Sequence, residues 1–224
     1  MSDSITAPAE DYLKAIYDIE RGGEPAATND IAARLGIAAA SVSGMIRRLA
    51  DQGLIKHERY KGTRLTATGR KAALRTIRRH RVIEAYLARA LGYPWDSVHE
   101  EAERLEHAAS DELVDRMARA IGEPHIDPHG APIPTREGDV DETPLRTLLD
   151  LKAGQRCRVV SVADEDADLL RYVAKLGLRP GTEVEIVDRA PFDGPISLRV
   201  RPNEAAVQIG PVLAGLMHVT AIAD

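Results

Sequence analysis

A nine-residue segment near the middle of the chain, His99-Glu100-Glu101-Ala102-Glu103-Arg104-Leu105-Glu106-His107, concentrates side chains that bind metal ions. On a helix, positions 99, 103, 106 and 107 fall on one face, because residues three and four apart are neighbours there. This face stacks two imidazoles and two carboxylates within a couple of helical turns. The spacing therefore predicts a cluster of metal ligands.

His80 and Glu84 form a second pair, four residues apart, on the helix predicted to precede that segment. If the two helices pack together, about five or six nitrogen and oxygen ligands converge, which suits a six-coordinate divalent cation. The competing interpretation is a solvated, charge-rich helix face. Two His-x-x-x-Glu pairs on consecutive helices favour the metal site.

The same segment does not match a catalytic zinc motif. The peptidase pattern His-Glu-x-x-His needs a histidine where this chain has Glu103. The sequence also contains no Gly-x-Ser-x-Gly, phosphate-binding loop or dinucleotide-binding fingerprint. We therefore do not expect an enzyme.

The elements that position these residues begin with a DNA-binding pattern. Although the net charge is −5, residues 47–81 hold 12 basic and only 2 acidic side chains, a local positive field of the kind that meets phosphate. Three predicted helices and a β-ribbon form a winged helix-turn-helix, with Thr28 as the cap of the second helix. Their expected ranges are 8–21, 28–36, 41–52 and, for the ribbon, 54–60 and 63–68.

The candidate DNA-contacting residues lie at the second helix, on the third helix and on the wing. They are Thr28, Ser41, Ser43, Arg47, Arg48, Arg59, Lys61 and Arg64. Together they fit phosphate positioning with a few base contacts. The alanine-rich stretch 37–40 in front of the third helix also predicts methyl contacts to thymine and readout of DNA shape.

The rest of the chain divides into helices, a linker and a β-rich part. We predict helices over 69–91, 95–108 and 110–121 (capped by Ser110), whose alanine- and leucine-rich faces indicate a dimer interface. Five short strands and a helix over 168–176 predict an SH3-like barrel. The expected fold is mainly α with a small β domain, divided into a DNA-binding domain 1–75, a metal-binding and dimerisation domain 76–126, a Pro-rich linker 127–146 and the SH3-like domain 147–224.

Composition indicates the cellular compartment of the protein. Cys157 is the only cysteine, which excludes an intramolecular disulfide and a multi-cysteine zinc site. The N-terminus does not read as a signal peptide, and no apolar run approaches a membrane span, so we expect a cytoplasmic protein. The remaining histidines are assigned structural or solvent roles: His57, His125, His129 and His218.

The sequence resembles the iron- and manganese-dependent repressors of the diphtheria-toxin-repressor type. The carrying segments are EDYLKAIYDIE, IAARLGIAAASVSGMIRRLADQGLI, LTATGRKAA, RRHRVIEAYL, VHEEAERLEHAASDELVDRM, PHGAPIP and LLRYVAKLGLRPGTEVEIVDR. The resemblance implies a primary metal site formed by Asp11, Glu103, Glu106 and His107. It also implies an ancillary site formed by His80, Glu84 and His99, with Asp166 as a further ligand from the C-terminal domain.

The sequence departs from members of the family in three respects. Iron-responsive members carry Met and Cys where this chain has Asp11 and Glu103, and these hard oxygen donors favour Mn²⁺, with Fe²⁺ as the alternative. The manganese-responsive branch usually has Glu where this chain has Lys14, and it typically lacks a C-terminal domain.

The resemblance implies a homodimeric, metal-activated repressor that binds an inverted-repeat operator. Metal held by Asp11 and by the helices behind it would favour one arrangement of the recognition helices, so metal and operator would bind cooperatively. One alternative is a winged-helix regulator of a small organic ligand, and another is a metalloenzyme with a vestigial DNA-binding domain. Activation of some genes, instead of repression, is also left open by the sequence.

Overall fold

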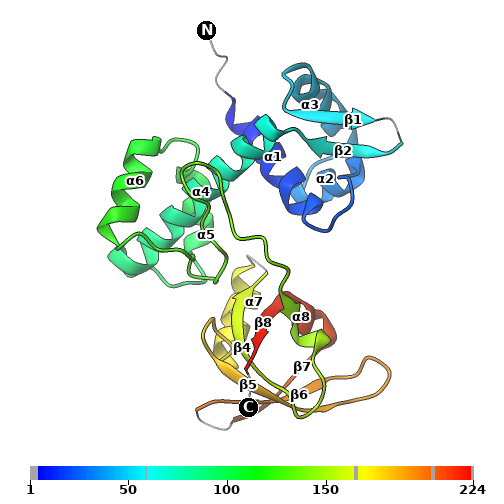
Figure 1. The fold of residues 1–224 in the computed structure, drawn as a ribbon, viewed down its shortest axis with the longest axis vertical. Coiled ribbons are helices and arrows are strands. Elements are labelled where there is room, and N and C mark those ends of the chain that lie inside the picture. Colours follow the sequence, from blue (N-terminus) through cyan, green and yellow to red (C-terminus); the bar gives the residue numbers. More distant parts are fainter. Residues whose placement is uncertain (1–4, 59, 164–165, 203–204, 223–224) are drawn as a thin grey trace. The chain divides into compact units, whose positions relative to one another are not determined.

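The computed structural model describes residues 5–58, 60–163, 166–202 and 205–222, and the chain divides into two compact units (Figure 1). The first unit comprises residues 1–80, 106–109 and 134–140, and the second comprises 81–105, 110–133 and 141–224. As predicted, the chain is mainly helical with a small antiparallel β domain at its C-terminal end. No described helix combines the length and apolar character that crossing a bilayer would require.

The first unit is a winged helix-turn-helix. Its elements are α1 (Ala7–Glu20), α2 (Thr28–Leu35), α3 (Ala39–Asp51), β1 (Ile55–Glu58), β2 (Gly62–Leu65) and the first part of α4 (Ala67–Leu91). The apolar positions that recur at helical spacing meet in one core, including Leu13, Ile16, Ile31, Val42, Ile46 and Leu49. Gly36 ends α2 in the left-handed conformation, with φ 65°.

The start of α2 differs from the prediction. Thr28 is the first residue of the helix, and Ala27 occupies the capping position without any side-chain cap. The predicted Thr28 cap is therefore wrong. The sequence offered Thr28 as the nearest good capping residue, but the bridge between Ala26 and Thr63 fixes the backbone just before the helix.

The wing packs closely on the start of α4. Strands β1 and β2 are antiparallel, with Ile55 opposite Leu65 and Glu58 opposite Gly62. A Cβ atom on Gly69 would lie 1.9 Å from the carbonyl oxygen of Leu54, so only glycine fits at this crossing.

The second unit contains the C-terminal part of α4 together with α5 (Val98–Leu105) and α6 (Asp111–Ala120). Ser110 caps α6 as predicted, since its side chain accepts a hydrogen bond from the backbone N–H of Leu113 at 3.2 Å. Helix α5 is shorter than the predicted 95–108, and it ends immediately before Glu106.

The C-terminal part of this unit is a six-stranded antiparallel sheet in the order β3-β8-β4-β5-β6-β7. Its strands are β3 (Arg146–Thr147), β4 (Arg156–Val162), β5 (Glu183–Arg189), β6 (Ile196–Val200), β7 (Ala205–Ile209) and β8 (Met217–Ala221). The predicted helix is α7 (Ala167–Lys175), while β3, the short helix η1 (Leu148–Asp150) and α8 (Pro211–Leu216) were not predicted.

The segment predicted as a linker contains a tight turn against this sheet. Asp127 accepts hydrogen bonds from the backbone N–H groups of His129 and Ala131, at 2.8 and 3.0 Å. A Cβ atom on Gly130 would lie 2.0 Å from the carbonyl oxygen of Val160. The turn over 127–131 is therefore fixed on β4, which explains why part of the segment is buried.

Candidate metal centres

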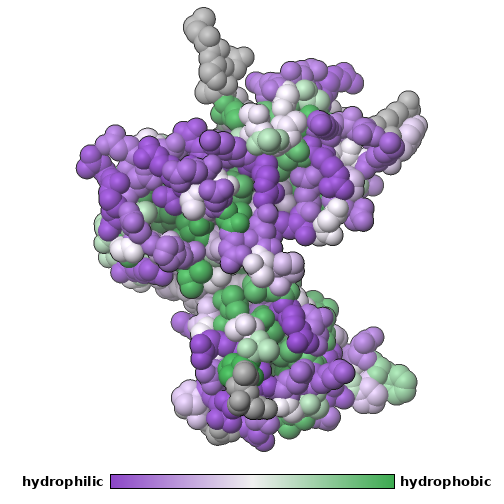
Figure 2. Space-filling model, viewed as in Figure 1, coloured by the Kyte–Doolittle hydropathy of each residue, from purple (hydrophilic) through white to green (hydrophobic). Residues whose placement is uncertain are grey.

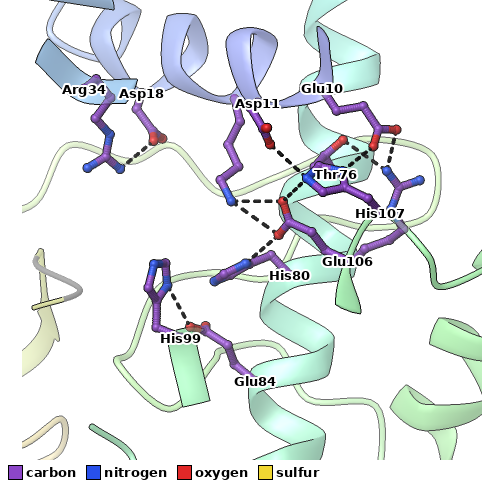
Figure 3. A network of polar contacts seen from close by, with 12 residues as sticks. Glu10, Asp11, Asp18, Arg34, Thr76, His80, Glu84, His99, Glu106 and His107 are labelled. Carbon is purple, nitrogen blue, oxygen red and sulfur yellow. Dashed lines mark hydrogen bonds and ion pairs between the residues drawn. The ribbon is translucent and has the colours of Figure 1, made fainter. Parts of the chain in front are cut away.

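Three potential ligands converge in the first unit. Asp11 on α1 meets Glu106 and His107, which follow directly after α5, and one ligand atom from each lies within 4.8 Å of the others. We call these three residues the α1 cluster. Figure 3 shows Asp11, Glu106 and His107 joined by dashed contacts, with Glu10 and His80 beside them.

The orientation of His107 is set by carboxylates on both sides of its ring. Its Nδ1 lies 2.7 Å from Glu10 Oε2, and its Nε2 lies 2.9 Å from Asp11 Oδ1. An ionised carboxylate only accepts, so Nδ1 donates to Glu10. Burial lowers the pKa of His107, but the hydrogen bond to Glu10 and the charges of Asp11 and Glu106 outweigh burial and raise it above its usual value.

Glu106 is a fully buried carboxylate surrounded by cationic or hydrogen-bonding groups. The ammonium of Lys14 contacts both of its oxygens, at 3.1 and 3.3 Å, and His80 Nδ1 lies 2.5 Å from Oε2. Burial raises the pKa of Glu106, but the His80 hydrogen bond and the Lys14 charge more than offset it, so the pKa is lowered. Glu106 is therefore held in its ionised, ligand-competent form.

Glu10 was missed by the sequence reasoning. It bridges His107 and Arg79, whose guanidinium nitrogen lies 2.5 Å from Glu10 Oε1. Its partners stand 69 and 97 positions further along the chain, so no local spacing could have revealed the contact.

A second group of potential ligands lies entirely within the second unit. Glu84, Asp127 and His129 are all buried, and one ligand atom from each lies within 4.8 Å of the others. We call this the buried cluster. Next to it, His99 Nδ1 lies 3.5 Å from Glu84 Oε1 (Figure 3).

The carboxylates of the buried cluster are electrostatically strained. Burial and the nearby charge of Glu84 raise the pKa of Asp127 to about 6, against the opposing effects of Arg81 and His129. The positive charge of a bound cation would relieve this repulsion. Carboxylates with a perturbed pKa at close range are also typical of functional sites. A structural or solvent role was predicted for His129, and its burial among these acids contradicts only the solvent role.

The structure places the predicted ligands as follows. Asp11, Glu106 and His107 meet in the first unit, where His80 contacts Glu106. Glu84 and His99 meet in the second unit, which also holds Glu103.

Asp166 was predicted as a ligand from the C-terminal domain. The structure gives it a local role as the N-cap of α7, where it accepts a hydrogen bond from the Leu169 backbone N–H at 2.8 Å. Within the described residues it belongs to neither cluster. A carboxylate just before a helix is suited to capping, which sequence similarity alone could not separate from metal binding.

Both donor sets fit a hard or borderline divalent cation. Each combines two carboxylate oxygens with one imidazole nitrogen, and the only cysteine, Cys157, is buried in the core of the C-terminal sheet. Oxygen and imidazole donors suit Mn²⁺ or Fe²⁺ better than a soft metal ion.

The predicted DNA-contacting residues lie mostly on exposed positions of the winged helix. Those exposed on α3 and the wing are Ser41, Ser43, Arg47, Arg48, Lys61 and Arg64, while Thr28 is half-buried. Arg59 lies outside the described residues. The surface around α3 and the β1–β2 hairpin is mostly hydrophilic in the view of Figure 2. Opposite that exposed face, Val42, Ile46 and Leu49 anchor α3 in the core.

Three family descriptions match successive parts of the chain. Residues 4–63 match the iron-dependent repressor N-terminal DNA-binding domain, and residues 66–135 match the iron-dependent repressor metal-binding and dimerisation domain. Residues 146–221 match the FeoA domain.

Curated relatives and solved structures agree with these matches. The iron-dependent repressor IdeR of Mycobacterium tuberculosis is 32% identical over 196 residues, covering 82% of this chain and 85% of the relative. The diphtheria toxin repressor of Corynebacterium diphtheriae is 32% identical over 199 residues, covering 84% of this chain and 87% of the relative. A solved manganese-dependent transcriptional repressor in complex with manganese has a TM-score of 0.88 and 39% identity, covering 96% of this chain and 100% of that chain.

Proposed function

Since the chain belongs to the family of iron-dependent repressors, we propose that it is a repressor activated by Mn²⁺, with Fe²⁺ as the alternative ion. Members of this family are metal-dependent, DNA-binding transcriptional regulators and are not enzymes. The metalloenzyme alternative is thereby excluded. The proposed target is an inverted-repeat operator bound by a homodimer.

The observation that carries this proposal is the α1 cluster. Asp11 stands on the first helix of the winged domain, and Leu13 and Ile16 of that helix share a core with Ile46 of α3. A bound divalent cation would supply the positive charge that holds Asp11 against Glu106 and His107. Asp11 would thus fix α1, and α1 would fix α3 through the shared core.

The residues around the α1 cluster orient and ionise its side chains for binding a metal ion. Glu10 orients His107 so that Nε2 faces Asp11, and Lys14 with His80 keeps Glu106 ionised. These roles resemble the outer contacts that set ligand direction and basicity in metal sites. The buried cluster of Glu84, Asp127 and His129 is our candidate for a second divalent cation.

The preference for Mn²⁺ is supported by the donors themselves. Asp11 and Glu106 offer hard oxygens, and neither cluster contains sulfur. The solved structure reported above is described as a manganese-dependent transcriptional repressor in complex with manganese, which supports the same choice.

Dimerisation and operator binding divide between the two units. The helical part of the second unit leaves large apolar side chains exposed on the single chain, as a dimer interface would require: Leu91, Tyr93, Leu105 and Leu113. In the winged helix, Ser43 and Arg47 lie one turn apart on the exposed face of α3, suited to a groove and its phosphates.

The test is a fluorescence-anisotropy titration of the chain's own promoter DNA in Mn²⁺ and in excess EDTA. We expect tight binding only with Mn²⁺, and we expect Asp11→Asn to lose that dependence while keeping its thermal unfolding midpoint. Equal affinity in Mn²⁺ and EDTA would contradict the proposal and favour the regulator of a small organic ligand. Repeating the titration with Fe²⁺, Co²⁺ and Zn²⁺ ranks the activating ions.

A further inference from the structure

The tautomer of His129 is fixed by a residue that carries no metal-binding group. His129 Nε2 lies 2.7 Å from the backbone carbonyl oxygen of Trp95. A carbonyl only accepts, so Nε2 carries the proton and the neutral ring presents its lone pair at Nδ1. Nδ1 is the atom that lies 3.8 Å from Glu84 Oε1. Trp95 therefore directs the donor nitrogen of His129 into the buried cluster.

Trp95 is held in turn by the C-terminal domain. The guanidinium of Arg179 lies over the indole ring, 4.9 Å from its centroid, and the indole packs against the core of the C-terminal sheet. The next residue, Asp96, forms an ion pair with Arg171 of α7 at 3.2 Å. A cation stacked on an indole is the strongest of the cation–π contacts, so Arg179 restrains the ring.

The main chain of His129 is fixed by the same domain. The backbone N–H of Val162 in β4 donates to the His129 carbonyl oxygen at 3.0 Å, and Gly130 lies directly against Val160. The imidazole and indole rings themselves are in contact, with centroids 5.6 Å apart. Both the ring and the backbone of His129 are thus positioned from the C-terminal side.

We propose that Arg179, acting through Trp95, is a positioning residue that sets the affinity of the buried cluster for a divalent cation. The C-terminal domain would then adjust metal binding without supplying a ligand. The inference rests on the proposed function in one respect, namely that Glu84, Asp127 and His129 bind a metal ion.

Trp95 is the only tryptophan of the chain, so its fluorescence reports on this position. Full-length protein is titrated with Mn²⁺ while Trp95 emission and the free-Mn²⁺ electron paramagnetic resonance signal are recorded. Arg179→Met should raise the dissociation constant for the Mn²⁺ ion that the fluorescence reports by about fivefold or more, because loss of outer contacts weakens metal sites. Arg179→Lys should recover most of the affinity, because an ammonium also stacks on an indole.

The matched control is Arg158→Met, which removes an exposed arginine of the same sheet that pairs with Glu183. It should bind Mn²⁺ like the wild type, and thermal midpoints will confirm that all variants are folded. If Arg179→Met does not fold, Trp95→Phe measured by paramagnetic resonance keeps the carbonyl, weakens the stacking and should lower the affinity in the same direction.

A folded Arg179→Met variant that binds Mn²⁺ within twofold of the wild type would overturn the inference. The His129→Ala variant identifies the signal, since it should abolish the fluorescence response while leaving Mn²⁺ binding at the α1 cluster. A wild type that binds Mn²⁺ only at the α1 cluster would overturn the inference too, but would leave metal-dependent operator binding intact. Loss of all metal dependence would instead contradict the proposed function.

Discussion

The Nδ1 atom of His107 lies 2.7 Å from a carboxylate oxygen of Glu10, a residue 97 positions earlier in the chain. The contact turns the other ring nitrogen, Nε2, toward Asp11 and Glu106, at 2.9 and 3.4 Å. The Glu10 carboxylate lies on one side of the His107 imidazole and the candidate metal position lies on the other. This arrangement fixes the direction of the ring and raises the basicity of the ligand nitrogen.

Glu10→Gln should weaken Mn²⁺ binding at the α1 cluster by about 10- to 100-fold, because an amide holds the imidazole less firmly and carries no charge. Isothermal titration with Mn²⁺ measures the change, and operator affinity at limiting Mn²⁺ should fall in parallel. Asp18→Asn is the matched control, since Asp18 lies on the same helix and pairs with Arg34 instead. If both variants bind Mn²⁺ equally well, Glu10 does not position His107.

Arg47→Ala should lower operator affinity and reduce the slope of log affinity against log salt by about 0.9, the value for one lost phosphate contact. Arg47 is exposed on α3, and its helix is anchored by Ile46 and Leu49 on the opposite side. Anisotropy titrations at several salt concentrations measure the slope. Arg116→Ala on α6, where the arginine pairs with Glu112, should leave both quantities unchanged.

Gly69→Ala should destabilise the winged helix by at least about 2 kcal/mol, because the new methyl group would overlap the backbone and force a shift. The added Cβ would stand 1.9 Å from the carbonyl oxygen of Leu54. Gly44→Ala is the control, since a Cβ there meets nothing within 4 Å and should stabilise α3 by about 0.5–1 kcal/mol. Urea unfolding of the two variants would show opposite shifts, and a shared sign would contradict the close-packing argument.

Cys157 should not react with thiol reagents in the folded protein at pH 8. Burial in the core of the C-terminal sheet raises its pKa to about 11, so about one thiol in a thousand is ionised at that pH. The folded state retains the proton while the unfolded thiol loses it, so stability falls as the pH rises from about 9 toward 11. Ellman's reagent should report the thiol only at the rate of unfolding, and rapid labelling of native protein would refute this prediction.

The amino-acid sequence by itself determined the local features of this protein. Helical periodicity located α1, α3, α4 and α6 nearly to their ends, and Ser110 was recognised as a helix cap because its partner, Leu113, is only three residues away. The ligand-bearing segment from His99 to His107 was also found from helical spacing, but α5 ends at Leu105, so the predicted single helix face that includes Glu106 and His107 is wrong. Chemistry that depends on neighbours along one helix can be read from spacing alone.

Only the tertiary structure decided which distant groups meet. Glu10 faces His107, Lys14 faces Glu106, and Asp127 joins His129 beside Glu84, across separations that no periodic pattern encodes. The sequence predicted a linker over 127–146 because this segment is rich in Pro, Gly and Asp. The turn over 127–131 is buried because Gly130 permits a close approach to Val160. The cost of burying Asp127 is offset by hydrogen bonds from the backbone N–H groups of His129 and Ala131. Burial of polar groups depends on packing between distant segments, so it could not be predicted from the sequence.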